Sequence, residues 1–324
     1  MALNDLMRQL GLAALAGLFL AACSTSETRA PEPAPMDSLV SVEWLHQHLN
    51  DPDLVVLDAT VMVEQGDDGK FINYNGRGNY ETGHIPGAGF ADLLGDELRD
   101  TDSPFDIMAP DPGQFAAGMA ALGVSDDSRV VIYDVMGGVW SARVWWMLRW
   151  IGFDRAALLD GGIKAWTDAG YPLSTEPVVR KPGRLSVNPR PQLFSDRHEV
   201  LDALSDSKVH VIDSLSAAHY SGEWTMYARP GHIPTAVNVS VFQLFDEAGQ
   251  FRSNPELAGL FSTPTDQRTI TYCGGGIAAA SNAFTLVRLG YTDVAIYDGS
   301  LEEWAADPEL PMSVSPDPEF DEVE

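Results

Sequence analysis

The sequence predicts an α/β protein of two similar domains, each with a buried, largely parallel β-sheet that carries helices on both faces. The chain has 324 residues, which exceeds one typical hydrophobic core and suits two domains. Short apolar segments alternate with longer segments whose apolar residues have helical spacing. One ordered series of these segments also occurs twice along the chain.

The first copy of the series begins with an apolar strand at 54–58 that ends in an acid. Gly-His-Ile-Pro-Gly-Ala follows at 83–88, and a second apolar strand covers 129–134. A third strand then leads through Asp-Gly-Gly to Trp166. These three apolar segments are expected to lie side by side in one sheet.

The second copy repeats the same order of segments. A strand at 209–213 precedes Gly-His-Ile-Pro-Thr-Ala at 231–236, and a second strand ends at Cys273. The interval from the end of the second strand to the tryptophan is 32 residues in the first copy (134 to 166) and 31 in the second (273 to 304). The matching order and spacing indicate an internal duplication.

Three segments between the strands predict helices. Apolar residues recur at helical spacing in 42–49, in 141–151 and in 278–289. Glycine follows directly after the last two segments, which is typical of a helix end.

The N-terminus carries an apolar run, 10–20, that is too short to span a bilayer and has the length of a signal-peptide core. It ends in Leu-Ala-Ala-Cys, which resembles a bacterial lipobox with Cys23 as the lipidated residue. This predicts a periplasmic protein anchored to a membrane by Cys23 alone, and Ser24 favours the outer membrane over the inner. The alternative is an ordinary secretory signal that leaves a soluble periplasmic protein.

The domain boundaries follow from these segments and from the proline-rich stretches. The predicted organisation is a signal peptide at 1–23, a flexible tether at 24–38, a first domain at 39–173, a linker at 174–192, a second domain at 193–312 and an acidic, disordered tail at 313–324.

The formal net charge of −27 disfavours nucleic acid as a partner, because such a surface repels phosphate backbones. The net charge does not exclude small anionic substrates, because a local cluster of N–H groups can outweigh the repulsion from distant negative charges.

Of the two cysteines, Cys273 has no disulfide partner once Cys23 is lipidated. Cys273 follows a strand and precedes three glycines and a helix, which places it at the ligand-binding edge of a parallel sheet. N–H groups of such a loop and the helix N-terminus are expected to lower the thiol pKa and to stabilise a thiolate or persulfide. A buried, inert cysteine beside a tight turn is the alternative.

The first copy has Asp134 at the position of Cys273. A carboxylate cannot carry a sulfur atom, so the first domain is predicted to be non-catalytic.

Together these motifs resemble the tandem-domain rhodanese family, the thiosulfate and 3-mercaptopyruvate sulfurtransferases, over residues 40–312. Segments 103–108 and 115–123 also resemble the inactive N-terminal half of that family. The resemblance implies a five-stranded parallel sheet flanked by helices in each domain, and no metal or organic cofactor. It implies a small sulfur donor (3-mercaptopyruvate or thiosulfate) and a thiol or cyanide acceptor.

By the same resemblance, Cys273 is the nucleophile that forms the persulfide. The loop that cradles its sulfur consists of Gly274, Gly275, Gly276, Ile277 and Ala278.

The chain departs from the family at the donor site. Leu215 stands where the family has an arginine, and His219 stands where the mercaptopyruvate enzymes have a second one. Arg229 is the candidate that could supply positive charge to the substrate instead. The neutral loop is closer to the mercaptopyruvate type, and the donor stays open.

Three other functions are alternatives to sulfur transfer from a small donor. Cysteine phosphatases need an arginine that closes a longer loop, and the chain has alanines at 278–280. The stronger rival is a non-catalytic sulfur carrier or binding module that a partner protein feeds; such a partner is unknown. A wholly structural lipoprotein with an unreactive thiol is the third alternative.

The remaining polar and aromatic residues have structural expectations. His84 and His232 are expected to shape turns, with His84 facing the active site as the alternative. Arg143 and Arg149 are expected at the surface. The expected core and interface tryptophans are Trp140, Trp145 and Trp146.

Overall fold

The protein is described by a computed structural model that covers residues 36–66 and 71–314. The predicted signal peptide, the lipidated Cys23, residues 24–35 of the tether and residues 315–324 of the tail lie outside the described residues. Within the described ranges, no helix is long and apolar enough to cross a membrane.

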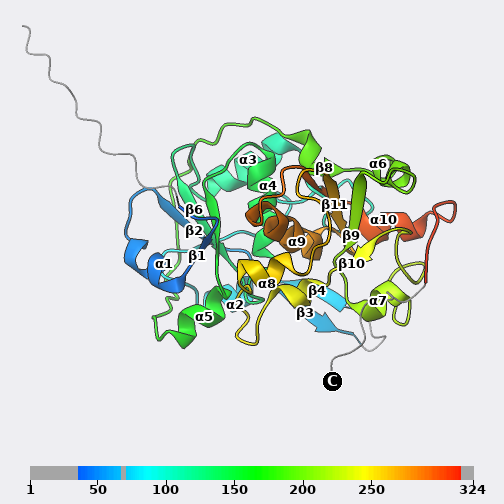
Figure 1. Cartoon of the computed structure of the whole chain (residues 1–324). Coiled ribbons are helices and arrows are strands. Elements are labelled where there is room, and N and C mark those ends of the chain that lie inside the picture. The colour runs from blue at the N-terminus through cyan, green and yellow to red at the C-terminus, as the bar shows by residue number, and fades with distance from the viewer. Residues whose placement is uncertain (1–35, 67–70, 315–324) are drawn as a thin grey trace, which may run out of the picture. The chain divides into compact units, whose positions relative to one another are not determined.

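The first domain contains a parallel five-stranded sheet in the order β1-β7-β6-β2-β5 (Figure 1). The three inner strands are entirely buried, which explains their largely apolar sequences. The strands are β1 (Leu39–Val40), β2 (Leu54–Asp58), β5 (Gly89–Phe90), β6 (Arg129–Tyr133) and β7 (Ala156–Leu159).

The described part of this domain contains five helices, and two of them confirm the predicted segments 42–49 and 141–151. They are α1 (Val42–His48), α2 (Arg77–Thr82), α3 (Pro112–Ala121), α4 (Ser141–Trp150) and α5 (Gly162–Asp168). Local sequence sets where they begin: the Ser41 side chain accepts from the amide of Trp44, and Asp111 caps α3 ahead of Pro112.

The second domain has the sheet order β10-β9-β11-β12-β8. In reverse, this is the order of the first sheet, so each strand has a counterpart and the predicted duplication is confirmed. The strands are β8 (Phe194–Ser195), β9 (Val209–Asp213), β10 (Val237–Asn238), β11 (Arg268–Tyr272) and β12 (Val294–Tyr297).

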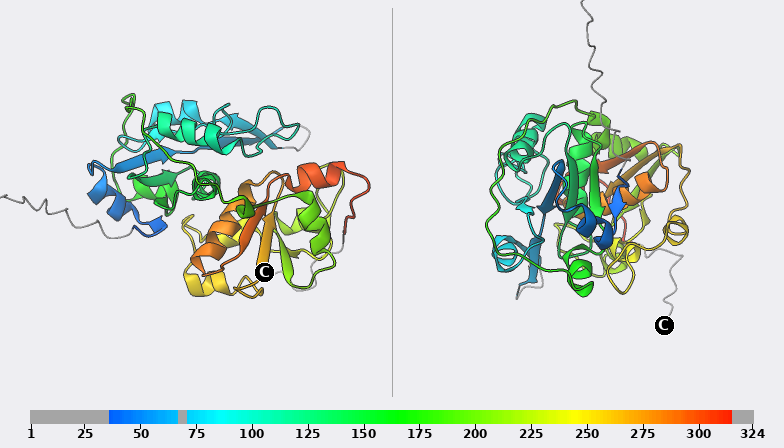
Figure 2. Two further views of the ribbon diagram at one scale, coloured as in Figure 1. Left: turned by 90° about the horizontal axis from the view of Figure 1, so that it is seen from above. Right: turned by 90° about the vertical axis from the view of Figure 1, so that its left-hand side faces the viewer.

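The helices of the second domain lie on both faces of its sheet (Figure 2). They are η1 (Pro191–Leu193), α6 (Arg197–Ala203), α7 (Ala217–Ser221), η2 (Val241–Leu244), α8 (Asn254–Ala258), α9 (Ile277–Arg288) and α10 (Ser300–Ala306). The two domains therefore confirm the predicted class of tandem parallel sheets flanked by helices.

A two-stranded antiparallel sheet was not expected. It consists of β3 (Val61–Gln65) and β4 (Phe71–Asn75) in the first domain. Five of its apolar side chains are exposed, so no burial pattern marked it. They are Met62, Val63, Phe71, Ile72 and Tyr74.

The paired histidines shape the two equivalent turns, as predicted. The ring of His84 stacks on Tyr80 with centroids 4.0 Å apart, and that of His232 stacks on Tyr220 at 3.6 Å. Each Nδ1 contacts the carbonyl oxygen of its tyrosine, at 2.9 and 2.6 Å. The alternative role of His84 at the active site finds no support in these contacts.

The two turns also pair with segments that the sequence assigned to the linker and the tail. His84 exchanges backbone hydrogen bonds with Ser174, and His232 does so with Ser313. Arg288 on α9 of the second domain binds the segment that precedes the first domain. Its Nη1 lies 2.7 Å from the Asp37 carboxylate and 3.1 Å from the Ser38 hydroxyl. The last tether residues and the first tail residue are therefore held by the folded domains.

Helices α4 and α9 pack against each other and join the two domains (Figure 1). The ring of Trp145 meets Phe284 edge-on with centroids 4.9 Å apart. Trp140, Trp145 and Trp146 are all buried, which confirms their predicted place in the core and interface. Because α4 begins after Asp134 and α9 begins after Cys273, this contact brings the two equivalent loops to the domain interface.

Candidate active site

Cys273 lies at the carboxyl end of β11, the middle strand of the second sheet, as the sequence predicts. Its side chain is free of any disulfide and only 3% exposed. The carboxyl end of a central parallel strand is where α/β proteins bind ligands.

The backbone around Cys273 is held by the start of α10. The Cys273 amide donates to the Ser300 hydroxyl at 3.2 Å, and its carbonyl oxygen accepts from the amide of Leu301 at 3.0 Å. The carbonyl of Gly274 accepts from the amide of Glu302 at 3.0 Å. These bonds fix the direction in which the thiol points.

Two of the three glycines in the loop are required by space. A Cβ on Gly274 would lie 1.8 Å from the Tyr227 hydroxyl oxygen. Gly276 has a φ of +78°, and a Cβ there would lie 2.9 Å from the Arg143 guanidinium and from Asp298. At Gly275 the nearest atom, a Glu302 carboxylate oxygen, would be 3.5 Å away, an ordinary contact.

The pKa of the Cys273 thiol is raised, whereas the sequence predicted that the loop would lower it. Burial raises the pKa of Cys273, and the amides of Ala279, Gly275, Gly276 and Ala278 act in the opposite direction without overcoming it. The loop therefore directs N–H groups at the sulfur as predicted, but desolvation outweighs them.

The remaining predicted loop residue, Ile277, is the first residue of α9, and its side chain is buried in the hydrophobic core. Ala279, which the sequence analysis did not include, contributes its amide because the first turn of α9 leaves that group directed at the sulfur.

The first domain has a longer loop, 135–140, at the equivalent place, and the Asp134 carboxylate lies within it. The Asp134 carboxylate is fully buried and accepts four backbone N–H groups. The donors, at distances of 2.6, 3.1, 2.9 and 2.7 Å, are Met136, Gly138, Trp140 and Ser141. The strand–loop–helix geometry of this fold thus creates an anion cradle in both copies.

Arg143 belongs to this site, contrary to the surface position expected of it. Its side chain is fully buried and its Nη1 lies 2.6 Å from the Asp298 carboxylate. Its Nη2 donates to the carbonyl of Ile107 at 2.9 Å. A buried guanidinium from the first domain thus abuts the catalytic loop of the second. Arg149 is paired with Asp154 near the surface, as expected.

The burial of Arg143 could have been predicted from the sequence. It lies three residues from both Trp140 and Trp146, so helical geometry places it on the same face as buried side chains.

The outer side of the loop is lined by aromatic and acidic groups. The partly buried Tyr227 has a raised pKa, caused by desolvation first and then by the charges of Cys273 and Glu302. The half-buried Glu302 also has a raised pKa, because of burial, and its Oε2 accepts from the amide of Asp106 at 3.2 Å. Neither residue was identified from the sequence.

Comparison of the two copies could have identified Glu302. Counted from Asp160 and Asp298, it stands opposite Lys164, so the charge is reversed between the copies. Lys164 is exposed and pairs with Asp168.

The two positions where the family has an arginine carry no positive charge here. Leu215 is half-buried and packs against the core. His219 is buried, its Nδ1 lies 2.8 Å from the Ser216 hydroxyl, and burial lowers its pKa, which keeps the ring neutral at pH 7. Its ring lies 4.3 Å from that of Trp224, which in turn meets Phe71 of the first domain.

Arg229 was predicted to bind the sulfur donor, but in the structure its guanidinium binds the protein backbone. Its guanidinium forms four hydrogen bonds to backbone carbonyls at the end of α10 and just beyond. The acceptors are Ala305, Leu310, Trp304 and Asp307. These bonds satisfy carbonyls that a helix end leaves open.

Across residues 36–66 and 71–314, no three His, Cys, Asp or Glu side chains come together in a way that could hold a metal ion.

Comparison with known proteins agrees with this geometry. The rhodanese-like domain family matches residues 41–169 and 196–307. The chain is 34% identical over 316 residues to thiosulfate/3-mercaptopyruvate sulfurtransferase 1, mitochondrial, of Arabidopsis thaliana, covering 89% of this chain and 80% of that protein. It is 34% identical over 281 residues to the 3-mercaptopyruvate sulfurtransferase of Escherichia coli K12, covering 84% and 96%.

A crystal structure of the 3-mercaptopyruvate sulfotransferase from Escherichia coli, described as having the rhodanese fold, superposes with a TM-score of 0.73 at 32% identity and covers 82% of this chain and 99% of that one. With two matched domains in one chain and full-length relatives above 30% identity, this protein belongs to the tandem-domain rhodanese family, the thiosulfate and 3-mercaptopyruvate sulfurtransferases.

Proposed function

We propose that the protein is a sulfurtransferase in which Cys273 accepts a sulfur atom from a small donor, holds it as a persulfide and passes it to a thiophilic acceptor. The observation that carries the proposal is the position of Cys273 at the end of β11, with loop amides directed at its sulfur. The similar loop around the Asp134 carboxylate supports the view that this loop stabilises a negative charge.

The first half-reaction with 3-mercaptopyruvate begins with the Cys273 thiolate. The thiolate attacks the donor sulfur, the donor carbon–sulfur bond breaks, and its electron pair stays on carbon as an enolate. The proton of the donor thiol goes to that carbon, so the products are pyruvate and the Cys273 persulfide anion. With thiosulfate, the same attack breaks the sulfur–sulfur bond and releases sulfite.

The second half-reaction restores the thiolate. Cyanide or a thiolate attacks the outer sulfur of the persulfide, and the sulfur–sulfur bond breaks toward Cys273. With cyanide the product is thiocyanate. The loop amides serve both halves because the negative charge at Cys273 lies on its own sulfur in the thiolate and on the outer sulfur in the persulfide. Burial raises the thiol pKa, so the reacting thiolate is the minor form at pH 7.

The outer side of the loop favours 3-mercaptopyruvate over thiosulfate. Glu302 lies beside Gly275, and His219 and Leu215 offer no positive charge. A dianion such as thiosulfate is repelled by this carboxylate more strongly than a monoanion is. 3-Mercaptopyruvate is therefore the proposed donor.

The test is the intact mass of the full chain after incubation with 3-mercaptopyruvate or with thiosulfate. We expect a gain of one sulfur atom, larger with 3-mercaptopyruvate, and no gain in Cys273→Ser. Loss of the added mass on addition of cyanide, with formation of thiocyanate, completes the cycle. No gain with either donor would reject turnover of a small donor and would favour a carrier fed by a partner protein.

The proposed location is the periplasm, with the chain anchored to a membrane through lipidated Cys23 and the outer membrane favoured. The support is the Leu-Ala-Ala-Cys sequence after the apolar run. In a bacterial host, wild type is expected in the membrane fraction with a fatty-acid label, and Cys23→Ser without it. A label-free wild type in the soluble periplasmic fraction would contradict the anchor.

A further inference from the structure

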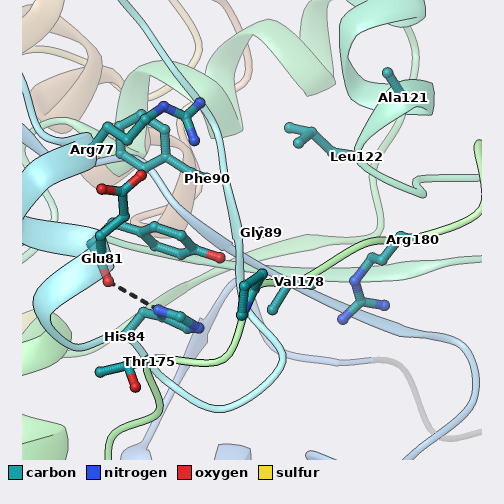
Figure 3. Close-up of a pocket in the computed structure, with 12 residues that line it drawn as sticks. Arg77, Glu81, His84, Gly89, Phe90, Ala121, Leu122, Thr175, Val178 and Arg180 are labelled. Atoms are coloured by element: carbon teal, nitrogen blue, oxygen red, sulfur yellow. Dashed lines mark hydrogen bonds between the residues drawn. The ribbon is translucent and has the colours of Figure 1, made fainter.

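The first domain contains a cavity that the sulfur-transfer site does not use. Its volume is about 400 Å³, and it lies beside the edge strand β5, between α2, the end of α3 and the segment 175–180 of the linker (Figure 3). Every lining residue belongs to the first domain or to this linker segment. The linker closes one side because backbone bonds tie it to the first domain, for example from the Gly183 amide to the Ala120 carbonyl at 2.7 Å.

Two guanidinium groups line the cavity without a carboxylate partner. In the described residues, neither Arg77 nor Arg180 forms an ion pair, although the chain carries 47 acidic residues. Glu81 also lines the cavity and is not paired with either group. Arg180 is partly desolvated, which lowers its pKa. Its Nη1 and Nη2 donate to the carbonyls of Leu54 and Gly87 at 3.4 and 2.8 Å, and its Nε is buried without a hydrogen-bond partner. A partly buried cation without an anion is costly, and an anionic ligand would compensate it.

His84 supplies a third polar group. The side chain is 1% exposed, and its Nε2 is buried without a partner among the described residues. Figure 3 shows this nitrogen turned toward Val178, across the cavity. Because Nδ1 donates to the Tyr80 carbonyl, Nε2 of the neutral ring is an acceptor. A ligand hydroxyl would satisfy it.

The rest of the wall is apolar. Phe90, Leu122 and Val178 line the cavity, and the Arg77 guanidinium lies over the Phe90 ring at 4.7 Å from its centroid. Cations for a carboxylate, an acceptor for a hydroxyl and an apolar wall for a small carbon skeleton therefore surround one space.

We propose that this cavity is a second binding site, specific for a small hydroxycarboxylate, and that it is separate from the Cys273 site. The carboxylate pairs with Arg180, the hydroxyl donates to His84, and the carbon skeleton lies against Phe90 and Leu122, on the side of the cavity where the Arg77 guanidinium adds positive charge. Since the linker forms part of the wall, the bound ligand joins the linker to the first domain and stabilises the folded protein.

The test uses 4-hydroxybenzoate as the probe and the full chain carrying Cys273→Ser, so that the catalytic thiol takes no part. Saturable broadening of the probe's proton NMR signals and a rise in melting temperature are measured together. Arg180→Gln and Arg77→Gln each remove one cation of the site. Arg184→Gln is the matched control, because Arg184 is exposed in the same linker and does not line the cavity.

We expect saturable binding that weakens at least tenfold in both site variants and is unchanged in Arg184→Gln. Benzoate, which lacks the hydroxyl, and sulfate, which lacks the apolar part, should bind more weakly than the probe at equal ionic strength. Absence of saturable binding, or equal binding by Arg77→Gln and the control, would overturn the proposal. Arg77 is exposed on a short helix, so its variant remains informative if Arg180→Gln fails to fold.

Discussion

At the scale of single residues, the surroundings of Cys273 are set by what lies directly against the loop. The sequence identified the nucleophile because an unpaired cysteine follows a strand and precedes three glycines. It could not identify Tyr227 or Glu302. Both side chains contact the loop from segments that are distant from it along the chain.

The two neighbouring glycines of the loop should differ sharply in tolerance. Gly274→Ala places a Cβ on the Tyr227 hydroxyl, and the loop must shift to relieve the contact. We expect persulfide formation to slow by about tenfold or more. Gly275→Ala, the matched control with only ordinary contacts, should retain most of the rate. Equal rates for the two variants, measured by quenched-flow mass spectrometry, would show that Tyr227 does not cover the loop.

Glu302 should control which donor reacts. In Glu302→Gln a negative charge beside the loop is lost, and an interaction of about 1 kcal/mol at a partly buried site changes a rate about fivefold. The rate with thiosulfate should therefore rise relative to that with 3-mercaptopyruvate. The exposed Glu309→Gln serves as control for net charge. An unchanged ratio of the two rates would remove Glu302 from the account of specificity.

Asp213 should make stability depend on pH. Burial raises its pKa to about 7, whereas an unfolded aspartate has a pKa of about 3.9. The folded state then binds more protons between these values, so stability falls as pH rises from about 4 to 7, by at most about 4 kcal/mol. Asp213→Asn should flatten the dependence of the urea midpoint on pH, while the exposed Asp266→Asn should not. A slope that Asp213→Asn leaves intact would place the titrating group elsewhere.

At the scale of elements, both domains repeat a unit in which a strand, a loop and a helix follow one another: β6 and α4 in the first domain, β11 and α9 in the second. Strands β2, β6, β9 and β11 have the predicted positions. They were recognisable because strands of a parallel sheet that is covered on both faces have largely apolar sequences. The hairpin β3–β4 escaped prediction because its exposed side chains carry no burial pattern.

The loop of the first domain should prove structural. In Asp134→Ala, four N–H groups, three of them buried, lose their acceptor, which is expected to cost about 3 kcal/mol or more in unfolding free energy. At temperatures where the variant stays folded, Cys273 should still form its persulfide. The exposed Asp127→Ala in the same domain should be near neutral in urea unfolding. Wild-type stability of Asp134→Ala would show that the carboxylate is not the loop's essential anion.

At the scale of the whole molecule, the first domain packs against the loop that follows Cys273 in the second domain. Helix α4 meets α9, and the Arg143 guanidinium pairs with Asp298 against Gly276. The first domain thus supplies part of the wall behind the loop that follows Cys273.

This coupling can be measured in a double-variant cycle. Arg143→Met leaves Asp298 without its buried partner and should lower the unfolding free energy by about 3–5 kcal/mol. Adding Asp298→Asn should recover part of that loss, because no unpaired buried carboxylate remains. Strictly additive losses would mean that the two side chains do not depend on each other.

The sequence by itself determined the α/β class, the two copies and the place of Cys273 at the end of a strand, because each of these follows from local patterns of burial, glycine and spacing. The order of the strands within each sheet came from the structure. The tertiary structure decided what the loop meets. It buried Arg143, placed Glu302 and Tyr227 beside the loop, turned Arg229 toward a helix end and raised the pKa of Cys273. Contacts between distant segments and the desolvation they cause depend on how the domains pack, which no local pattern specifies.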